Sequence, residues 1–337
     1  MSGPSDDGLD SARPGERWVV RYRLPDGSAT DLTGWLDSLT PDAARLTTVD
    51  QQGHVVERAA VIVARRAPPA RGGPDPRRVS AADLERRALP GWLAEHEPLG
   101  DWTLRAAGGF TGRANSCLAV GDPGLPWDHA ADRVVAYADE HGIEPRALVV
   151  GGSREEAELR ALGWVDCYVP TEVLAVRLAD FLAAPPPRPG VRVVEELEPT
   201  WWAAYQQSRP NSADPAILKM ILDGNPPRAF ASADDDPFAD QPAAFAIARG
   251  HLSGDWLGLA SIWTRNDHRR RGWATAMMIA LGHWAARRGA RYGYLQVAAA
   301  NRDAITAYQR LGFVTHHGYR YLTPGEDQTQ RTRSVGA

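Results

Sequence analysis

The chain has 337 residues, 43% of them apolar, and a formal net charge of −4. This length allows two or three domains with packed cores, and the negative charge argues against general attraction to nucleic acid or an anionic membrane. Its two cysteines, Cys117 and Cys167, are too few for a disulfide framework. No run of 18 apolar residues predicts a membrane-spanning helix, and residues 1–15 lack the apolar region of a signal peptide. We therefore expect a cytoplasmic protein.

Residues 16–66 have the pattern of short β-strands. Residues 20–24 alternate apolar and arginine side chains, which is the period of a strand with one buried face. Turn signals at residues 25–27 and 52–53 separate the strands. The pattern resembles a small SH3-like barrel, between a disordered segment at 1–15 and a linker at 67–79 that is rich in proline and glycine.

The charge of this predicted barrel indicates its kind of partner. Residues 16–66 contain seven arginines and seven aspartates or glutamates, so the barrel is neutral. Because a barrel that binds nucleic acid would normally be basic, nucleic acid is an unlikely partner. We favour a docking module for a protein.

Two further units are predicted, at 80–182 and 191–324, with a proline-rich linker at 183–190 and a polar, disordered tail at 325–337. Helical and strand periodicities alternate in both units, which predicts an α/β (α+β) fold class. In the first unit we expect a helix capped by Ser80, strands at 102–106, 114–120 and 147–150, and helices at 128–141 and 155–162. In the second we expect strands at 191–195, 229–231, 243–248, 256–263, 292–297 and 313–322, and helices at 199–208, 214–222, 272–288 and 302–311.

A basic segment, His268–Ala276, joins the predicted strand at 256–263 to the helix that follows it. Its sequence is His-Arg-Arg-Arg-Gly-Trp-Ala-Thr-Ala. Backbone N–H groups and the positive end of the helix dipole converge at such a helix start, which suits an anion. Gly272 leaves room for a bulky anion to approach the backbone. The segment therefore predicts an anion-binding site.

This segment and the residues after it resemble the GNAT superfamily of N-acetyltransferases. Arg269–Ala274 matches the family's Arg/Gln-x-x-Gly-x-Gly/Ala loop between a strand and a helix. Downstream, the strand residues 295–297 followed by Asn301, Tyr308 and the Leu-Gly-Phe of 311–313 match the family's next segment. The resemblance implies acetyl-CoA as cosubstrate, an amine as acceptor and no metal.

The resemblance also implies which residues hold acetyl-CoA. Backbone groups of the strand would hold the pantetheine arm, where the strand separates from its neighbour, and the loop would cradle the pyrophosphate. The arginine side chains would assist there, or would only neutralise nearby acids. The residues assigned to acetyl-CoA are Ile262, Trp263, Thr264, Arg269, Arg270, Arg271, Gly272, Trp273, Ala274, Thr275, Asn301 and Tyr308.

Tyr308 is the candidate general acid for the leaving thiolate. A phenol has a pKa of about 10, close to that of an aliphatic thiol, so proton transfer would be nearly isoenergetic. Tyr308 lies seven residues after Asn301, which is two helical turns and places both on one helix face. The alternative is that Tyr308 only packs, because it is on the apolar face of its helix.

The general base is open. Many members of the family place an acidic residue at the start of the strand before the loop, and Asp255 is the candidate there. An ordinary role in a hairpin is the alternative for Asp255 and for the nearby His251. Glu195, Glu196 or a chain of water molecules are further candidates. One histidine of the pair at 316–317 would face the cleft if the strand alternates, and the favoured alternative is a surface pair.

The unit at 80–182 reads as a degenerate copy of the unit at 191–324. Strand, helix and a Leu-Gly-Trp at 162–164 repeat the order seen downstream. Its loop at 121–126 contains an aspartate and two prolines, which lack an N–H donor, and Leu159 stands where the other unit has Tyr308. We expect a half that does not bind acetyl-CoA and packs on the catalytic half. Residues 108–116 would either line the acceptor site or form a tight turn.

The function predicted from the sequence is therefore direct acetyl transfer to a primary amine. The acceptor is a small molecule or a protein amine, and no cysteine in 191–324 is present to carry the acyl group. A non-catalytic acyl-CoA sensor, with the barrel as output module, is the alternative of a different class. A regulator that binds nucleic acid is the third, and the neutral barrel counts against it.

Overall fold

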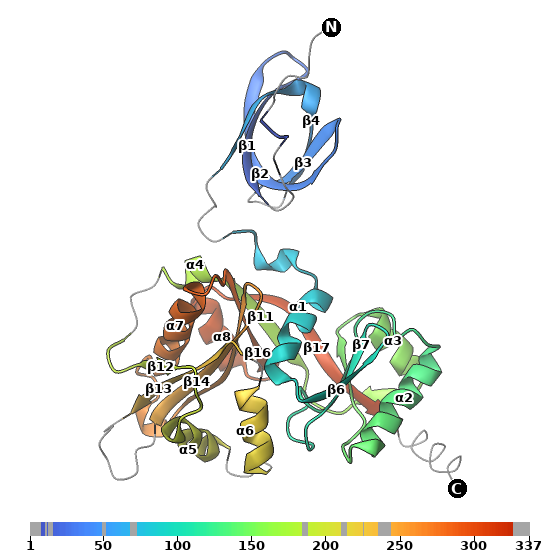
Figure 1. Cartoon of the computed structure of the whole chain (residues 1–337), viewed down its shortest axis with the longest axis vertical. Coiled ribbons are helices and arrows are strands. Elements are labelled where there is room, and N and C mark those ends of the chain that lie inside the picture. Colours follow the sequence, from blue (N-terminus) through green and yellow to red (C-terminus); the bar gives the residue numbers. More distant parts are fainter. Residues whose placement is uncertain are drawn as a thin grey trace. The chain divides into compact units, whose positions relative to one another are not determined.

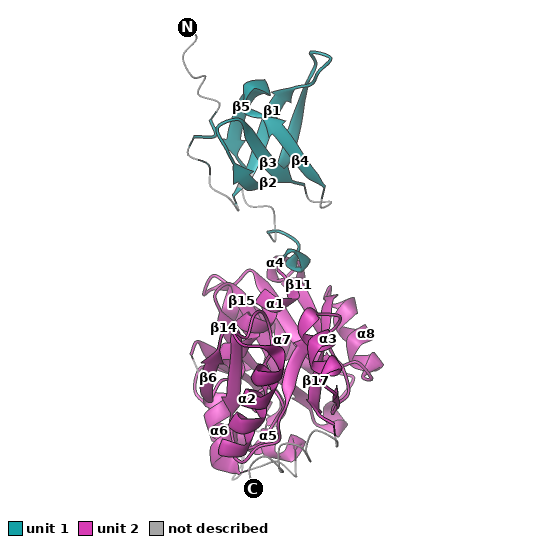
Figure 2. Cartoon of the chain, turned by 90° about the vertical axis from the view of Figure 1, so that its right-hand side faces the viewer, with its two compact units in different colours: residues 1–78 teal, residues 79–337 magenta. Residues whose placement is uncertain are grey.

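The structure is a computed structural model that forms two compact units, residues 1–78 and 79–337 (Figure 2). It describes residues 8–10, 12, 16–48, 52–67, 73–183, 188–209, 214–224, 226–234 and 244–325, except for the side chains of Arg17 and Trp35. Most of the segments predicted to be disordered, 1–15 and 325–337, lie outside these residues. Within the first of them, however, Leu9 is fully buried in the core of unit 1.

Unit 1 is a five-stranded antiparallel sheet in the order β4-β3-β2-β1-β5. The predicted alternation is present, because Trp18 and Val20 are buried on one face of β1. The predicted SH3-like barrel is not confirmed: β4 and β5 are the two edges, and no pairing among the described residues closes the sheet. Its elements are β1 (Arg17–Arg23), β2 (Ala29–Leu39), β3 (Ala43–Thr47), β4 (Gly53–Glu57), η1 (Arg58–Ala60), β5 (Val61–Arg66) and η2 (Pro76–Arg78).

Unit 2 is built on one mixed sheet of twelve strands, in the order β12-β13-β14-β15-β16-β11-β17-β9-β8-β7-β6, with β10 paired to β17. β15 pairs in parallel with β16, and β8 pairs in parallel with β9. All other paired strands are antiparallel. The strands are β6 (Glu95–Leu99), β7 (Trp102–Ala106), β8 (Cys117–Leu118), β9 (Ala147–Val150), β10 (Trp164–Asp166), β11 (Thr171–Arg177), β12 (Arg192–Val194), β13 (Arg228–Asp234), β14 (Ala244–Ser253), β15 (Trp256–Thr264), β16 (Tyr292–Ala298) and β17 (Val314–Pro324).

The two predicted halves of unit 2 exchange strands. β11 comes from the range 80–182, yet it lies between β16 and β17, which belong to the range 191–324. In return, β17 continues past β11 and pairs with β9 and β10 of the first half (Figure 1). Each half therefore completes the sheet of the other, and the two ranges share one continuous sheet.

Helices cover both faces of this sheet because its side chains alternate. Leu257 and Leu295 pack with α4, α7 and α8 on one face, here called the α7 face. Trp256 and Tyr294 pack with α1 on the other, the α1 face. The helices are α1 (Ala81–Ala88), η3 (Leu89–Trp92), α2 (Trp127–Glu140), α3 (Arg154–Ala161), α4 (Leu178–Phe181), α5 (Pro199–Ser208), α6 (Pro215–Asp223), η4 (Asn266–His268), α7 (Trp273–Ala286) and α8 (Arg302–Arg310). No helix among the described residues is both long and apolar enough to cross a membrane.

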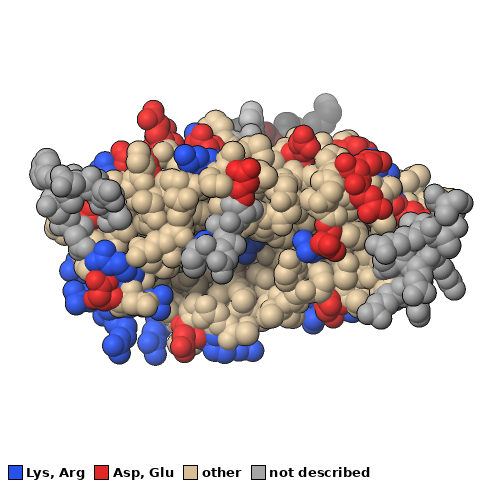
Figure 3. Space-filling view, turned by 90° about the horizontal axis from the view of Figure 1, so that it is seen from below, with Lys and Arg blue, Asp and Glu red and all other residues tan. Residues whose placement is uncertain are grey.

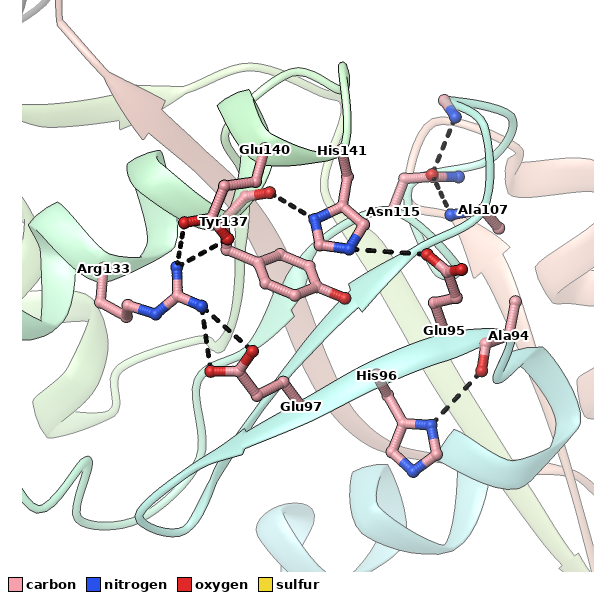
Figure 4. Close-up of polar contacts among 11 residues, drawn as sticks. Ala94, Glu95, His96, Glu97, Ala107, Asn115, Arg133, Tyr137, Glu140 and His141 are labelled. Carbon is pink, nitrogen blue, oxygen red and sulfur yellow. Dashed lines mark hydrogen bonds and ion pairs between the residues drawn. The ribbon is translucent and has the colours of Figure 1, made fainter.

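Polar contacts fix the first half of unit 2 around α2 and the loop before β8 (Figure 4). Arg133 on α2 donates to both carboxylate oxygens of Glu97 on β6, at 3.0 Å each, and also bonds Glu140. Asn115 holds the loop at 108–116: its Oδ1 accepts from the N–H groups of Ala107 and Gly109 at 2.7 and 2.8 Å. Buried amide bonds of this kind fix a loop that has no regular structure.

Candidate active site

The sheet opens between β15 and β16. The two strands pair in parallel only from Trp256 to Leu259 on β15, although β15 continues to Thr264. A bulge accompanies the separation: the register between β14 and β15 shifts after Ile247, and Ser261 has a φ of +52°. A bulge bends its strand and ends regular pairing. The edge of β15 after Leu259 is thereby released from β16, as the resemblance implied.

A cavity of about 430 Å³ occupies this opening. On the α7 face the cavity is lined by Asn301, which precedes α8, and by Ala304 and Tyr308 on α8. Its remaining lining comes from the strands and from the α1 face, where α5 ends and where the loop at 108–116 arrives. These residues are Trp92, Arg113, Ser208, Arg209, His251, Gly258, Leu259, Ala260, Ser261, Ile262, Trp263, Tyr294, Leu295, Gln296, Val297 and Ala298.

Beside the cavity, the turn from β15 to α7 presents its backbone N–H groups outward. Among the described residues, none of the six N–H groups from Arg270 to Thr275 donates a hydrogen bond. Arg270 and Gly272 have φ values of +58° and +80°, and a Cβ on Gly272 would meet only open space. Unpaired N–H groups at a helix start, with the positive end of the dipole, form an anion site.

Arginines surround this turn, and one of them supports it. The side chains of Arg269, Arg270 and Arg271 are exposed. Figure 3 shows a group of Lys and Arg side chains at the lower left of this view and, separately, a hollow near its centre. Arg188 donates to the backbone oxygen of Arg271 at 2.6 Å and stacks 4.0 Å from the ring centre of Trp273. The side chains of Thr264 and Thr275 do not line the cavity.

The corresponding loop of the first half already holds carboxylates of the protein itself. The N–H of Gly121 donates to Glu155 at 2.7 Å, and that of Asp122 donates to Asp101 at 3.0 Å. The N–H of Gly124 donates to the side chain of Asp122. Leu159, on α3 where the other half has Tyr308, is fully buried. The donors that a phosphate would need are therefore used internally in this half.

Tyr308 and Asn301 lie together at the α7-face end of the cavity. Asn301 caps α8, because its Oδ1 accepts from the N–H of Ala304 at 3.2 Å. Tyr308 both lines the cavity and packs against Phe313, with 6.1 Å between the ring centres. Burial raises the pKa of Tyr308, and its hydroxyl makes no hydrogen bond to any described residue. A protonated phenol is thus available at the cavity wall.

The structure separates Asp255 from the cavity. Asp255 lies in the turn before β15, three residues before Gly258, which is the first residue of β15 in the cavity lining, and Asp255 itself is not part of that lining. Its carboxylate bonds Arg291 at 2.7 Å and lies 3.7 Å from Arg87. This placement, among arginines and outside the cavity lining, argues against Asp255 as general base, and the role stays a prediction.

A substitution at Asp255 tests the predicted role as general base. We expect Asp255→Asn to leave acetyl transfer unchanged and to lower stability by at most about 1 kcal/mol, because it removes partly exposed ion pairs. Steady-state kinetics and thermal unfolding of the variant measure both effects. A large fall in kcat without loss of folding would restore Asp255 as the base.

Among the other base candidates, His251 lies at the cavity. Glu195 instead bonds Trp284 and Arg288, and His317 bonds Glu85 at 3.0 Å away from the lining. Nε2 of His251 shares a hydrogen bond with the Tyr294 hydroxyl at 3.0 Å. Burial, and secondarily the charge of Arg249, lower the pKa of His251 to about 3, so its imidazole is neutral near pH 7.

Sequence reasoning missed the lining residues that come from elsewhere in the chain. Trp92 belongs to the first half and Arg209 follows α5, whereas Arg113 lies in the segment 108–116 that was a candidate for the acceptor site. The alternation on β16 was a usable signal, because it places Tyr294 and Gln296 on the face of the sheet that receives the first half. Among the described residues, no group of three or more His, Cys, Asp or Glu side chains is placed to hold a metal ion.

A mixed sheet that opens between two parallel strands, with a cavity in the opening and unpaired N–H groups at the next helix start, is the arrangement of an N-acetyltransferase of the GNAT class. The chain belongs to the family described as probable histone acetyltransferase Rv0428c C-terminal, whose model matches residues 79–322.

Individual relatives agree with this assignment. The chain is 26% identical over 324 residues to the probable histone acetyltransferase Rv0428c of Mycobacterium tuberculosis strain H37Rv, covering 91% of this chain and 94% of that protein. It is 35% identical over 83 residues to the uncharacterized N-acetyltransferase YobR of Bacillus subtilis strain 168, covering 24% and 34%. The solved GCN5-related N-acetyltransferase from Kribbella flavida shares the fold, with a TM-score of 0.53, 18% identity and coverage of 74% of this chain and 98% of that one.

Proposed function

We propose that the protein transfers an acetyl group from acetyl-CoA directly to a primary amine. The observation that carries the proposal is the row of six unpaired N–H groups from Arg270 to Thr275 beside a cavity that passes through the sheet. Phosphates would bind these N–H groups, with Arg269–Arg271 around them. The released edge at Ile262–Thr264 would hold the pantetheine arm, and Asn301 would contact it from α8.

In this proposal Tyr308 supplies the proton that the reaction needs. The amine nitrogen forms a bond to the thioester carbon, the carbon–sulfur bond breaks, and the Tyr308 hydroxyl donates its proton to the sulfur. The amine gives up a proton in the same cycle, which returns the phenolate to the phenol through solvent. Because burial raises the pKa of Tyr308, the hydroxyl holds its proton until the thiolate develops.

The cysteines support direct transfer over an acyl-enzyme. Cys117 is buried and burial raises the pKa of its thiol, which suppresses the nucleophilic thiolate. Cys167 is half-buried, and burial raises its pKa as well. Neither lines the cavity.

The remaining assignments follow from the two halves and unit 1. The first half would be a non-catalytic GNAT-like half that walls the acceptor side, giving a tandem arrangement at 80–182 and 191–324. Unit 1 would dock a protein partner. The description of the mycobacterial relative as a probable histone acetyltransferase makes a protein amine one acceptor class, beside small-molecule amines.

Acetyl-CoA binding and thiol release test this proposal together. At 100 times its Kd, acetyl-CoA should stabilise the protein by about 2.7 kcal/mol, seen as a rise in Tm, and an amine panel should release free thiol. Stabilisation without thiol release from any amine would favour the acyl-CoA sensor. If acetyl-CoA neither stabilised the protein nor released thiol with any amine, the proposal would be wrong.

Gly272→Val should weaken acetyl-CoA binding by about 10-fold or more, because a side chain would occupy the space in front of the N–H groups and charged hydrogen bonds contribute about 1.5–3 kcal/mol each. Gly142→Val is the matched control: Gly142 also has a positive φ, +62°, and open surroundings, but it lies after α2. Both variants carry a similar backbone penalty. Equal loss of binding in the two would show that strain, not the anion site, is responsible.

A further inference from the structure

The α1-face end of the cavity carries positive charge without acids. Arg113 and Arg209 line it, and no Asp or Glu side chain is among its lining residues in the described part of the chain. Neither arginine forms an ion pair with a described carboxylate. Tyr308 and the anion site of the β15–α7 turn lie towards the α7 face, so these arginines stand on the side from which the second substrate would enter.

Arg113 is held in place by uncharged partners. Its Nε donates to the Tyr319 hydroxyl at 3.1 Å, and its guanidinium lies 5.1 Å from the ring centre of Trp92. The loop that carries it is fixed by Asn115 (Figure 4). A guanidinium offers five donors in a rigid fork, and only Nε is used by a described residue. The outer Nη atoms of Arg113 are therefore free for a ligand.

A second guanidinium raises the positive charge behind Trp92. Arg249 is fully buried, 5.6 Å from the Trp92 ring centre, and its bonds go to the backbone oxygens of Leu222 and Gly91 at 2.8 and 3.0 Å. Its Nη2 has no partner among the described residues. Buried charges are normally paired, and neither guanidinium around this indole forms an ion pair with a described carboxylate, so Arg113, which lines the cavity, is suited to a ligand that brings a negative charge.

The buried carboxylate on this face is already used. Glu85 is 3% exposed, and its Oε1 bonds His317 at 3.0 Å. The same oxygen accepts from Gln296, a lining residue, at 3.5 Å. Glu85 therefore offsets part of the charge from a distance, but it leaves the donors of Arg113 open towards the cavity.

We propose that the acceptor is a primary amine that also carries an anionic group, a carboxylate or a phosphate, and that Arg113 binds this group while the exposed Arg209 attracts it. The inference rests on the proposed function and names the substrate class for the same site. A lysine peptide with basic neighbours, which would need acids in the cavity, is the class it disfavours.

The same positive charge serves the chemistry of the amine. Nearby cations disfavour an ammonium group and so lower the pKa of a bound amine. The amine then reaches the thioester in its nucleophilic form, with no carboxylate base in the lining. The arginines therefore attract the anionic group of the acceptor, and their repulsion of an ammonium group keeps the amine unprotonated.

Binding of matched amine pairs to the full chain, saturated with CoA, tests the inference without requiring turnover. The pairs are ω-amino acids with their amides, aminoalkyl phosphates with the corresponding amino alcohols, and lysine peptides with acidic or basic flanks. We expect the anionic member to bind about 10- to 100-fold tighter, as a charged hydrogen-bonded pair predicts. The first two series separate carboxylate from phosphate. Equal binding within the pairs, or tighter binding of the basic peptide, would overturn the inference.

Variants assign the preference to Arg113. Arg113→Gln should remove the advantage of the anionic member, leaving its neutral partner and CoA within about twofold of the wild type. Arg287→Gln, an exposed arginine at the end of α7, changes the net charge equally and should keep the full advantage. If Arg113→Gln weakened both members of a pair equally while unfolding at the wild-type temperature, Arg113 would be a packing residue and the inference would be wrong. Thiol release with the same amines reports separately on the proposed function.

Discussion

A fragment of residues 188–325 is expected not to fold and to bind no acetyl-CoA, although it contains the complete motif from β15 to α8. The reason is β11, which lies between β16 and β17 and is absent from this fragment. Its side chains serve both faces: Leu174 and Val176 belong to the core on the α7 face, and Val173 to the core on the α1 face. All three are at most 2% exposed.

The free energy of folding that the fragment would lose is comparable with the net stability of a whole domain. Burial of three such side chains contributes about 5–9 kcal/mol, against a net stability of about 5–15 kcal/mol for a typical domain. Two long strand edges would also be left open to aggregation. The fragment of residues 79–325, which keeps β11, should fold and bind acetyl-CoA. Circular dichroism and thermal unfolding of both fragments measure the difference, and a cooperative, ligand-binding 188–325 fragment would contradict the strand exchange.

Tyr308→Phe should lower kcat by about 10²- to 10³-fold, the usual contribution of a positioned proton donor, while KM for acetyl-CoA stays within about twofold. Stability should not change, because the ring still packs on Phe313 and the hydroxyl has no hydrogen bond to lose among the described residues. Tyr137→Phe removes a phenol from a helix of the first half, far from the lining, and should leave kcat unchanged.

The pH profile supplies an independent check on Tyr308. Burial raises its pKa above the ordinary value of about 10. An acid with a raised pKa stays protonated to higher pH, so Tyr308 should cause no fall of kcat below pH 10. If kcat of Tyr308→Phe were unchanged, Tyr308 would not be the general acid and would only pack in the core.

The acetyl-CoA side of the site could be predicted because its residues are close in sequence. A strand, a turn and a helix start are local structures. Gly272 indicates the turn before α7, because glycine readily adopts the required positive φ, and Asn301 indicates the start of α8, because asparagine caps helices. The helices at 199–208 and 302–311 were predicted within a residue or two for the same reason.

The acceptor side could be predicted only in part: residues 108–116 were a candidate for it, but their partners depend on contacts between distant segments. Arg113 meets Tyr319 across more than 200 residues, and no periodicity encodes that pairing. Asp255 is close to the loop in sequence, but β15 lies between them, and the carboxylate is outside the cavity lining.

The path of β17 has a consequence for how the protein is made. β17 is the strand that joins the sheets of both halves, and it comes last among the described strands. Until residues 314–324 have left the ribosome, β9 and β11 each lack a neighbour, and neither half can close. Folding of unit 2 must therefore wait for β17, and a nascent chain stalled before this strand would expose unpaired strands to chaperones and proteases. The cavity between β15 and β16 is thus completed only after both halves have been synthesised.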